Sequence, residues 1–162
     1  MDGSTQGYHM PAGEGDAWWF VDTRMTVKAD GAATGGALTV IEWSAPVGFA
    51  PPLHVHPMEE EMFYLLSGSI RVVCGDQEWD AGPGSFVLLP RGVPHGFIVT
   101  GDEPVRGLQI TTPAGFERYL ADLGRRPAGP GLPPPEAPDI AHMGEVSTRH
   151  NYLMVGPPVG SG

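Results

Sequence analysis

Short β-prone segments separated by glycine and proline are the feature that most limits how this chain can fold. They are rich in valine, isoleucine, threonine and aromatic residues and recur at roughly 8- to 12-residue spacing, which is typical of β-sandwiches and β-barrels. No long helical periodicity appears before residue 114. The segments lie at 18–29, 37–45, 62–74, 77–80, 85–90, 91–100 and 105–112. We therefore predict an all-β domain of the barrel or sandwich type.

The composition is compatible with one folded domain and limits its partners. With 162 residues, of which 41% are hydrophobic, the chain can bury a core of ordinary size. A net charge of −10 and the lack of a basic stripe argue against nucleic acid as a partner. No apolar run approaches the ~20 residues that cross a bilayer, and the acidic N-terminal sequence lacks a secretory signal. Because Cys74 is the single cysteine, an internal disulfide is impossible, and we expect a cytoplasmic protein that does not bind membranes.

Composition also divides the chain into three parts. Residues 1–16 are polar and predict a flexible N-terminal arm. Residues 17–124 hold the β-prone segments and a short helix, which we expect to form the barrel domain. Residues 125–162 contain a proline-rich connector and an apolar tail, which we expect to pack on the barrel or on a second subunit.

Local signals predict a hairpin and two short helices. A Gly-Asp pair at 75–76 is typical of a tight turn between two paired strands. Pro113 near the start and Gly124 at the end of an amphipathic segment predict a helix over 113–124. A second short helix is expected near 137–147.

Two histidines and three glutamates stand before an apolar segment in HVHPMEEEMFYLLSG, residues 54–68. Alternate side chains of a strand share a face, so His54 and His56 can point at one ion. Glu61 opens the next strand, and His95 opens a later one. Three imidazoles and one carboxylate are a donor set that suits a divalent first-row metal and leaves coordination positions free.

For four other polar residues the sequence leaves more than one role or orientation open. Glu59 and Glu60 are predicted to lie in a solvated turn. If that turn is one residue shorter, Glu60 replaces Glu61 as the ligand, because a one-residue shift moves every side chain to the other face. Glu42, in the middle of a β-prone segment, is either exposed or orients a ligating histidine. Gln109 faces either the pocket or solvent.

The spacing of these residues resembles the two sequence motifs of the cupin family. The first motif is matched at Gly48, His54, His56, Glu61 and Gly68. The second is matched at Gly84, Pro90, Gly92 and His95. One position departs from the family pattern, because Val99 stands where the second motif usually ends with asparagine. That position is not a ligand in the family, so the change makes the barrel interior more apolar without removing a metal ligand.

The resemblance implies a cupin fold, which is a double-stranded β-helix or jelly-roll barrel, here followed by one or two short helices. It implies that His54, His56, Glu61 and His95 bind one divalent transition metal, which is Fe, Mn, Ni, Co, Cu or Zn. Strand parity around these ligands predicts a set of apolar residues that line the substrate pocket. They are Phe63, Leu65, Phe86, Leu88, Phe97 and Val99.

The segments around the motifs are similar to single-domain cupins related to quercetin dioxygenases. They are ALTVIEWSAPVGFAPPLHVH, AGPGSFVLLPRGVPHGF and TTPAGFERYLADLG. This similarity favours a metal-dependent dioxygenase that acts on a small apolar or aromatic oxygenated metabolite, with Glu61 helping to remove a substrate proton. One alternative is a non-oxidative Lewis-acid isomerase, cyclase or lyase of secondary metabolism. Another is a non-catalytic cupin that binds a small ligand.

We also expect a homodimer. An open barrel edge and apolar termini both need cover, which a second copy of the chain would provide.

Overall fold

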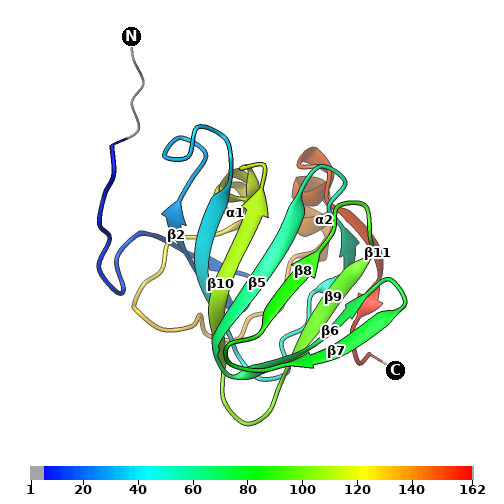
Figure 1. Ribbon diagram of the computed structural model, residues 1–162. Helices are drawn as coiled ribbons and strands as arrows, with labels where there is room; N and C mark the ends of the chain where they lie inside the picture. The colour runs from blue at the N-terminus through cyan, green and yellow to red at the C-terminus, as the bar shows by residue number, and fades with distance from the viewer. Residues whose placement is uncertain (1–5, 162) are drawn as a thin grey trace.

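The computed structural model of the protein describes residues 6–161, and within them two antiparallel sheets face each other (Figure 1). The six-stranded sheet has the order β1 (Asp16–Phe20), β2 (Thr23–Ala29), β3 (Thr39–Ala45), β10 (Val105–Thr112), β5 (Glu60–Ser67) and β8 (Phe86–Leu89). The five-stranded sheet has the order β11 (Leu153–Pro158), β4 (Pro52–Val55), β9 (His95–Thr100), β6 (Ser69–Cys74) and β7 (Gln77–Ala81). The prediction of an all-β fold with two short helices is confirmed.

Strand β5 has one buried face and one exposed face, as its alternating sequence pattern predicts. Glu61, Phe63 and Leu65 are buried, whereas Tyr64 and Leu66 are 42% and 40% exposed. This alternation is expected for a strand with one face on a core, because successive side chains point to opposite faces of the sheet. The predicted parity of this strand is therefore confirmed.

The middle of the barrel is filled by aromatic rings from both sheets. Trp43 lies 5.4 Å from both Phe63 and Phe97, and these two phenylalanines lie 5.5 Å apart, measured between ring centroids. Tilted and edge-on aromatic pairs of this kind add about 0.5–1.5 kcal/mol each beyond the burial of their area. They form a packed floor beneath the end of the barrel that holds the histidines.

The two helices begin slightly later than the sequence suggests. Helix α1 spans Phe116–Leu123 and packs Phe116, Tyr119 and Leu120 onto the barrel. Helix α2 spans Ile140–Arg149, and its start is set by Asp139, whose side chain accepts a hydrogen bond from the backbone N–H of His142 at 3.0 Å. No helix among the described residues is long and apolar enough to cross a membrane.

The segments outside the barrel pack against it. In the N-terminal arm, the Tyr8 hydroxyl donates a hydrogen bond to the backbone carbonyl of Lys28, and Lys28 Nζ donates one to the carbonyl of Glu14 at 2.6 Å. Residues 1–5 of the predicted arm lie outside the described residues. In the connector, the Gly131 carbonyl accepts a hydrogen bond from Trp19 Nε1 at 2.8 Å. The C-terminal tail pairs as β11 with β4, so it packs on the barrel of its own chain.

Candidate metal centre

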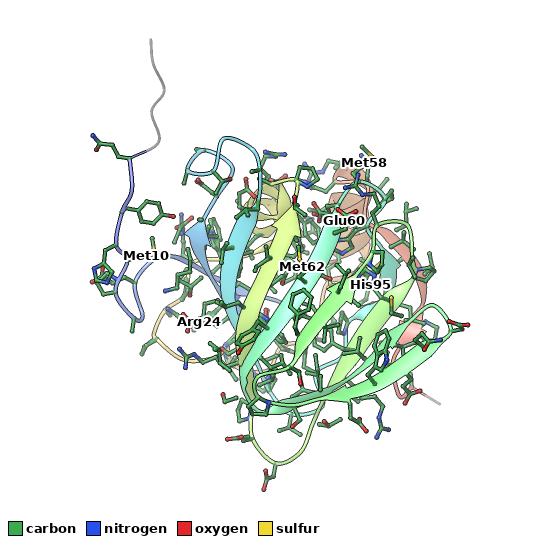
Figure 2. The ribbon with its side chains drawn as sticks, in the orientation of Figure 1. Met10, Arg24, Met58, Glu60, Met62 and His95 are labelled. Atoms are coloured by element: carbon green, nitrogen blue, oxygen red, sulfur yellow. The ribbon has the colours of Figure 1, made fainter. Side chains whose placement is uncertain are left out.

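Three strands bring the predicted ligands to one end of the barrel. His54 lies on β4 and pairs in register with His95, the first residue of β9, while His56 follows β4 directly. Glu61 is the second residue of β5 and faces inward. One potential ligand atom from each of these four residues lies within 4.8 Å of the other three. Figure 2 shows His95 beside β9 and Glu60 at the start of β5.

The hydrogen bonds of the three histidines leave the same nitrogen free on each ring. Nδ1 of His54 lies 2.8 Å from the Pro52 carbonyl, and Nδ1 of His95 lies 2.9 Å from the Val93 carbonyl. Nδ1 of His56 lies 3.0 Å from Oε1 of Glu59. Because these oxygens accept hydrogen bonds, each Nδ1 carries the proton and each Nε2 keeps a lone pair for a metal.

One contact in the cluster requires a proton or a metal ion between its two atoms. Nε2 of His95 lies 3.2 Å from Oε2 of Glu61, and both side chains are almost fully buried. This Nε2 atom has no hydrogen-bond partner among residues 6–161. Two lone-pair atoms so close together in a buried site need a shared proton or a metal ion between them. The donor set therefore fits the divalent transition metal that the sequence suggests.

The electrostatics of the cluster favour the protonation states that a metal requires at His54 and Glu61. Burial lowers the pKa of His54 to about 4. Burial alone would raise the pKa of Glu61, but the three neighbouring imidazoles outweigh it and hold this pKa at about 2. At neutral pH His54 is thus neutral and Glu61 is ionised, as metal ligands must be. For His56, burial works against the charged form, but the carboxylates of Glu61 and Glu59 raise its pKa.

Glu59 is the residue whose role the sequence prediction missed. Its predicted place in a solvated turn is wrong, because the side chain is only 7% exposed and folds back over His56. Besides its contact with His56, its Oε1 accepts a hydrogen bond from the Tyr152 hydroxyl at 2.7 Å. Burial and the adjacent Glu59 carboxylate raise the pKa of Tyr152, so this hydroxyl stays protonated and donates. A tyrosine in an apolar tail was the available signal, because a buried tyrosine hydroxyl needs a partner.

The other acidic candidates lie outside the cluster. Glu60 points away from the interior and pairs with Arg91 Nη2 at 2.6 Å, so the structure places Glu61, rather than Glu60, among the histidines. Glu42 lies on the outer face of β3 and pairs with Arg106 at 2.8 Å and with Lys28 at 3.4 Å. The interpretation of Glu42 as a partner that orients a ligating histidine is therefore wrong, and the side chain lies half-buried between its two cationic partners.

A cavity of about 350 Å³ opens beside the ligand cluster. Its walls are mainly apolar and include many aromatic rings, and no lysine or arginine lines it among the described residues. The aromatic lining residues are Phe20, Trp43, Phe49, Phe63, Phe97, Phe116, Tyr119 and Tyr152. Gln109 also lines this cavity and is 3% exposed, so of its two predicted orientations it takes the one toward the pocket. The C-terminal segment adds Pro138, Ile140, Met143, Tyr152, Met154 and Pro158, none of which the sequence analysis identified.

The predicted pocket residues divide into three groups. Phe63 and Phe97 line the cavity. Leu65 and Val99 are buried in the core but are not among the cavity-lining residues. For Phe86 and Leu88 the prediction is wrong, because these side chains are 60% and 48% exposed.

The error at β8 has a simple cause in the register. Phe86 pairs with the outward-facing Tyr64, whereas Val87 pairs with the inward-facing Phe63. Directly paired residues of neighbouring strands share a face, so Val87 and Leu89 fill the interior in place of Phe86 and Leu88.

Comparison with known sequences gives one family and two relatives. A cupin domain family model matches residues 41–111. Quercetin 2,3-dioxygenase from Bacillus subtilis (strain 168) is 26% identical over 117 residues, which are 72% of this chain and 34% of that protein. An uncharacterized protein of Methanocaldococcus jannaschii is 27% identical over 75 residues, 46% of this chain and 60% of that protein. The chain thus spans about a third of the dioxygenase and three-fifths of the second relative.

Two solved structures share this fold. KdgF from Halomonas sp. superimposes with a TM-score of 0.60 at 16% identity, covering 70% of this chain and 99% of KdgF. The polyketide cyclase RemF from Streptomyces resistomycificus gives a TM-score of 0.57 at 24% identity, covering 66% of this chain and 80% of RemF. At such identities the likeness concerns the fold alone. The family match runs from β3 to β10 and so includes each strand that carries a member of the cluster, and we conclude that this part of the chain matches the cupin domain family.

Proposed function

We propose that this protein is a metal-dependent enzyme that acts on a small aromatic, oxygen-bearing substrate, as a dioxygenase of the quercetinase type. The observation that carries the proposal is the position of the ligand cluster, which lies at the wall of an aromatic cavity of about 350 Å³. A concave, mostly apolar site with a few convergent polar groups is the usual form of a small-molecule site.

In this proposal His54, His56, Glu61 and His95 hold one divalent transition metal, which is Fe, Mn, Ni, Co, Cu or Zn. Such an ion supplies a Lewis acid for a substrate oxygen and, where it is redox-active, a path for electrons to dioxygen. Glu59 and two backbone carbonyls keep the Nε2 atoms directed at it.

The remaining residues of the cavity bind the substrate and exclude water. Phe63, Phe97 and Trp43 provide flat apolar surfaces for an aromatic ring. Glu61 is the carboxylate beside the three imidazoles, and we propose that it accepts the proton of the substrate hydroxyl. Its low pKa makes it a weak base by itself, so the transfer requires a hydroxyl that is already acidified by its surroundings.

The oxidative reaction is favoured by the similarity to quercetin 2,3-dioxygenase over 72% of this chain. In a reaction of that class both atoms of dioxygen enter the organic substrate. The substrate itself supplies the electrons that reduce dioxygen, so the reaction needs no external reductant. An aromatic enol or phenol fits both this electron demand and the apolar cavity.

The test begins with metal analysis of freshly purified protein, followed by incubation of the metal-loaded enzyme with quercetin and related flavonols under labelled ¹⁸O₂. We expect a product that contains two labelled oxygen atoms, and we expect His56→Ala and His95→Ala to lose both the metal and the turnover. Turnover that continues under strict anaerobiosis would contradict the oxygenase and support an isomerase, cyclase or lyase. Binding without product over long incubation in air would support a ligand-binding protein.

We also propose that two copies of the chain associate. Strand β8 ends the six-stranded sheet, and Tyr64, Phe86 and Leu88 expose apolar surface at this edge. Light scattering on the purified protein should give the mass of a dimer, whereas a monodisperse monomer would contradict the proposal.

A further inference from the structure

Buried polar atoms that lack partners are rare in folded proteins, and here two of the residues that carry such atoms, Gln109 and Trp43, line the cavity. Among the described residues four such side-chain atoms occur: Nε2 of His95, Nε2 of Gln109, Nε1 of Trp43 and Oγ1 of Thr111. The His95 atom belongs to the ligand cluster. The other three are on the adjacent strands β3 and β10, and their parent residues are at most 3% exposed.

The register of β10 places these three residues at successive levels of the barrel. Thr111 pairs with Glu61 at the level of the ligand cluster, and Gln109 pairs with Phe63 one level deeper. Gly107 is one level deeper again and pairs with Trp43 across β3. Inward-facing residues of a strand are spaced by about 7 Å, so Gln109 lies about 7 Å from the level of Glu61. Gln109 and Trp43 line the cavity, whereas Thr111 is not among its lining residues.

Gly107 allows the Trp43 indole to pack closely against β10. A Cβ atom at this position would lie 3.3 Å from Trp43 Nε1 and 2.9 Å from the backbone oxygen of Tyr64. The second of these distances is too short for a real contact, so a larger residue would have to displace the strand. Glycine therefore lets the indole N–H lie against β10, where it is buried without a hydrogen-bond partner.

We propose that Gln109 and Trp43 bind a second oxygen of the substrate, distinct from the oxygen that faces the metal ligands. The inference rests on the proposed function and specifies its substrate class. The carboxamide of Gln109 and the indole of Trp43 are uncharged donors, and the described part of the chain places no lysine or arginine in the cavity wall. The site thus suits a neutral acceptor such as a ketone carbonyl, and it disfavours a carboxylate or a phosphate. The matching substrate is an aromatic ketone whose carbonyl oxygen lies about 7 Å from its hydroxyl.

A pair of probes that differ in one group tests this subsite. 4-Hydroxybenzophenone has a phenol at one end and a ketone carbonyl in the middle, and 4-benzylphenol replaces that carbonyl with a methylene of similar size. Binding of each phenol to the metal-loaded protein is measured by isothermal titration calorimetry. We expect the wild type to bind the ketone at least tenfold more tightly, because the methylene leaves both donors unpaired.

Three variants locate the source of that preference. Gln109→Leu should reduce the preference for the ketone to less than threefold, and Gln109→Met, which has nearly the length of glutamine, serves if the leucine variant does not fold. Trp43→Phe should reduce the preference as well. Thr111→Val is the matched control, because it also removes a buried unpaired polar atom but lies outside the cavity lining, so the preference should stay at the wild-type value.

Stability provides a readout that does not depend on the substrate. Removing an unpaired buried amide should leave the Tm of ligand-free Gln109→Leu equal to or above that of the wild type, whereas a purely structural glutamine would lower it. Equal affinity of the wild type for the two phenols, or an undiminished ketone preference in both Gln109 variants, would overturn the subsite. Failure of both phenols to bind would overturn the substrate class inferred here. The proposed enzyme is judged separately, by whether its turnover requires dioxygen.

Discussion

Acidic side chains on the two faces of the six-stranded sheet have different partners. On the outer face, Glu60 pairs with Arg91 and Glu42 pairs with both Arg106 and Lys28. On the inner face, Glu61 meets only imidazoles, and within residues 6–161 it has no ion pair with a lysine or arginine. Glu60 and Glu61 are consecutive residues of one strand, so the alternation of side chains alone separates the two environments.

The outer face completes its ionic interactions within the chain, whereas the inner face keeps unpaired polar atoms that we propose a ligand satisfies. The outer carboxylates have their counter-charges within the chain and need nothing more. The inner face holds Glu61 together with unpaired atoms on Gln109, Trp43 and Thr111, and the unpaired Nε2 of His95 lies on the opposite sheet. A change on the inner face should therefore alter ligand binding, and a change on the outer face should alter stability only slightly.

The largest effect is expected from removing each of the two neighbouring carboxylates in turn. Glu61→Ala deletes a ligand and should weaken metal binding by at least about 100-fold, since loss of a partner that merely orients a ligand already costs 10–100-fold. Glu60→Ala deletes an exposed ion pair and should retain the full metal content, with a stability change of about 0–1 kcal/mol. Elemental analysis after gel filtration measures the metal. Equal metal content in the two variants would contradict this difference between the two faces of the sheet.

A somewhat smaller effect is expected from the metal itself. At a metal concentration 100 times the Kd, the free energy of unfolding should rise by about 2.7 kcal/mol, because the ion binds the folded state alone. For a chain of this size the Tm should increase by roughly 5–10 °C, as measured by scanning calorimetry. A chelator should reverse the shift, and Glu61→Ala should show none. A shift of the same size in that variant would mean that the ion binds elsewhere.

Two tyrosines provide the next contrast. Tyr152→Phe removes the hydroxyl that bonds to Glu59, which should loosen the orientation of His56 and weaken metal binding about tenfold. Tyr64→Phe alters an exposed outer-face ring and should leave the affinity unchanged. Competition with a colorimetric chelator gives both affinities. Wild-type affinity in Tyr152→Phe would show that the orientation of His56 does not depend on this hydroxyl.

The smallest effect is expected at Glu42. Glu42→Gln removes a carboxylate whose pKa is lowered by Arg106 and Lys28, which outweigh the opposing effect of partial burial. Because the site is partly solvated, the loss of stability in urea unfolding should stay within about 1 kcal/mol, and the metal content should not change. A drop in metal content would restore the hypothesis that Glu42 orients a ligand.

Local sequence rules predicted the part of the site that depends on local geometry. The parity of β5 placed Glu61, Phe63 and Leu65 on the buried face, and the motif spacing grouped Glu61 with the three histidines. These predictions depend only on the two-residue period of a strand and on short turns. Glycines with positive φ, such as Gly48 at 83° and Gly84 at 83°, mark some of those turns.

The features that the sequence did not predict depend on contacts between segments that are far apart in the sequence. Tyr152 reaches Glu59 across 93 positions of sequence, through a tail whose return to the barrel has no local signal. Phe86 and Leu88 were placed inside because their strand was read alone, whereas pairing with β5 decides which face they occupy. Glu59 was misassigned for the same reason, since its burial depends on the tail that covers it.

The C-terminal segment has a consequence for how this chain is shortened or recombined. The family match ends at residue 111, yet Met143, Tyr152 and Met154 form part of the cavity wall. A minimal version cut at the end of the family match would keep every proposed metal ligand and lose one side of the cavity. Grafting a different tail onto the same barrel would, conversely, exchange the chamber wall without touching the ligands, which gives a direct route to new substrate preferences.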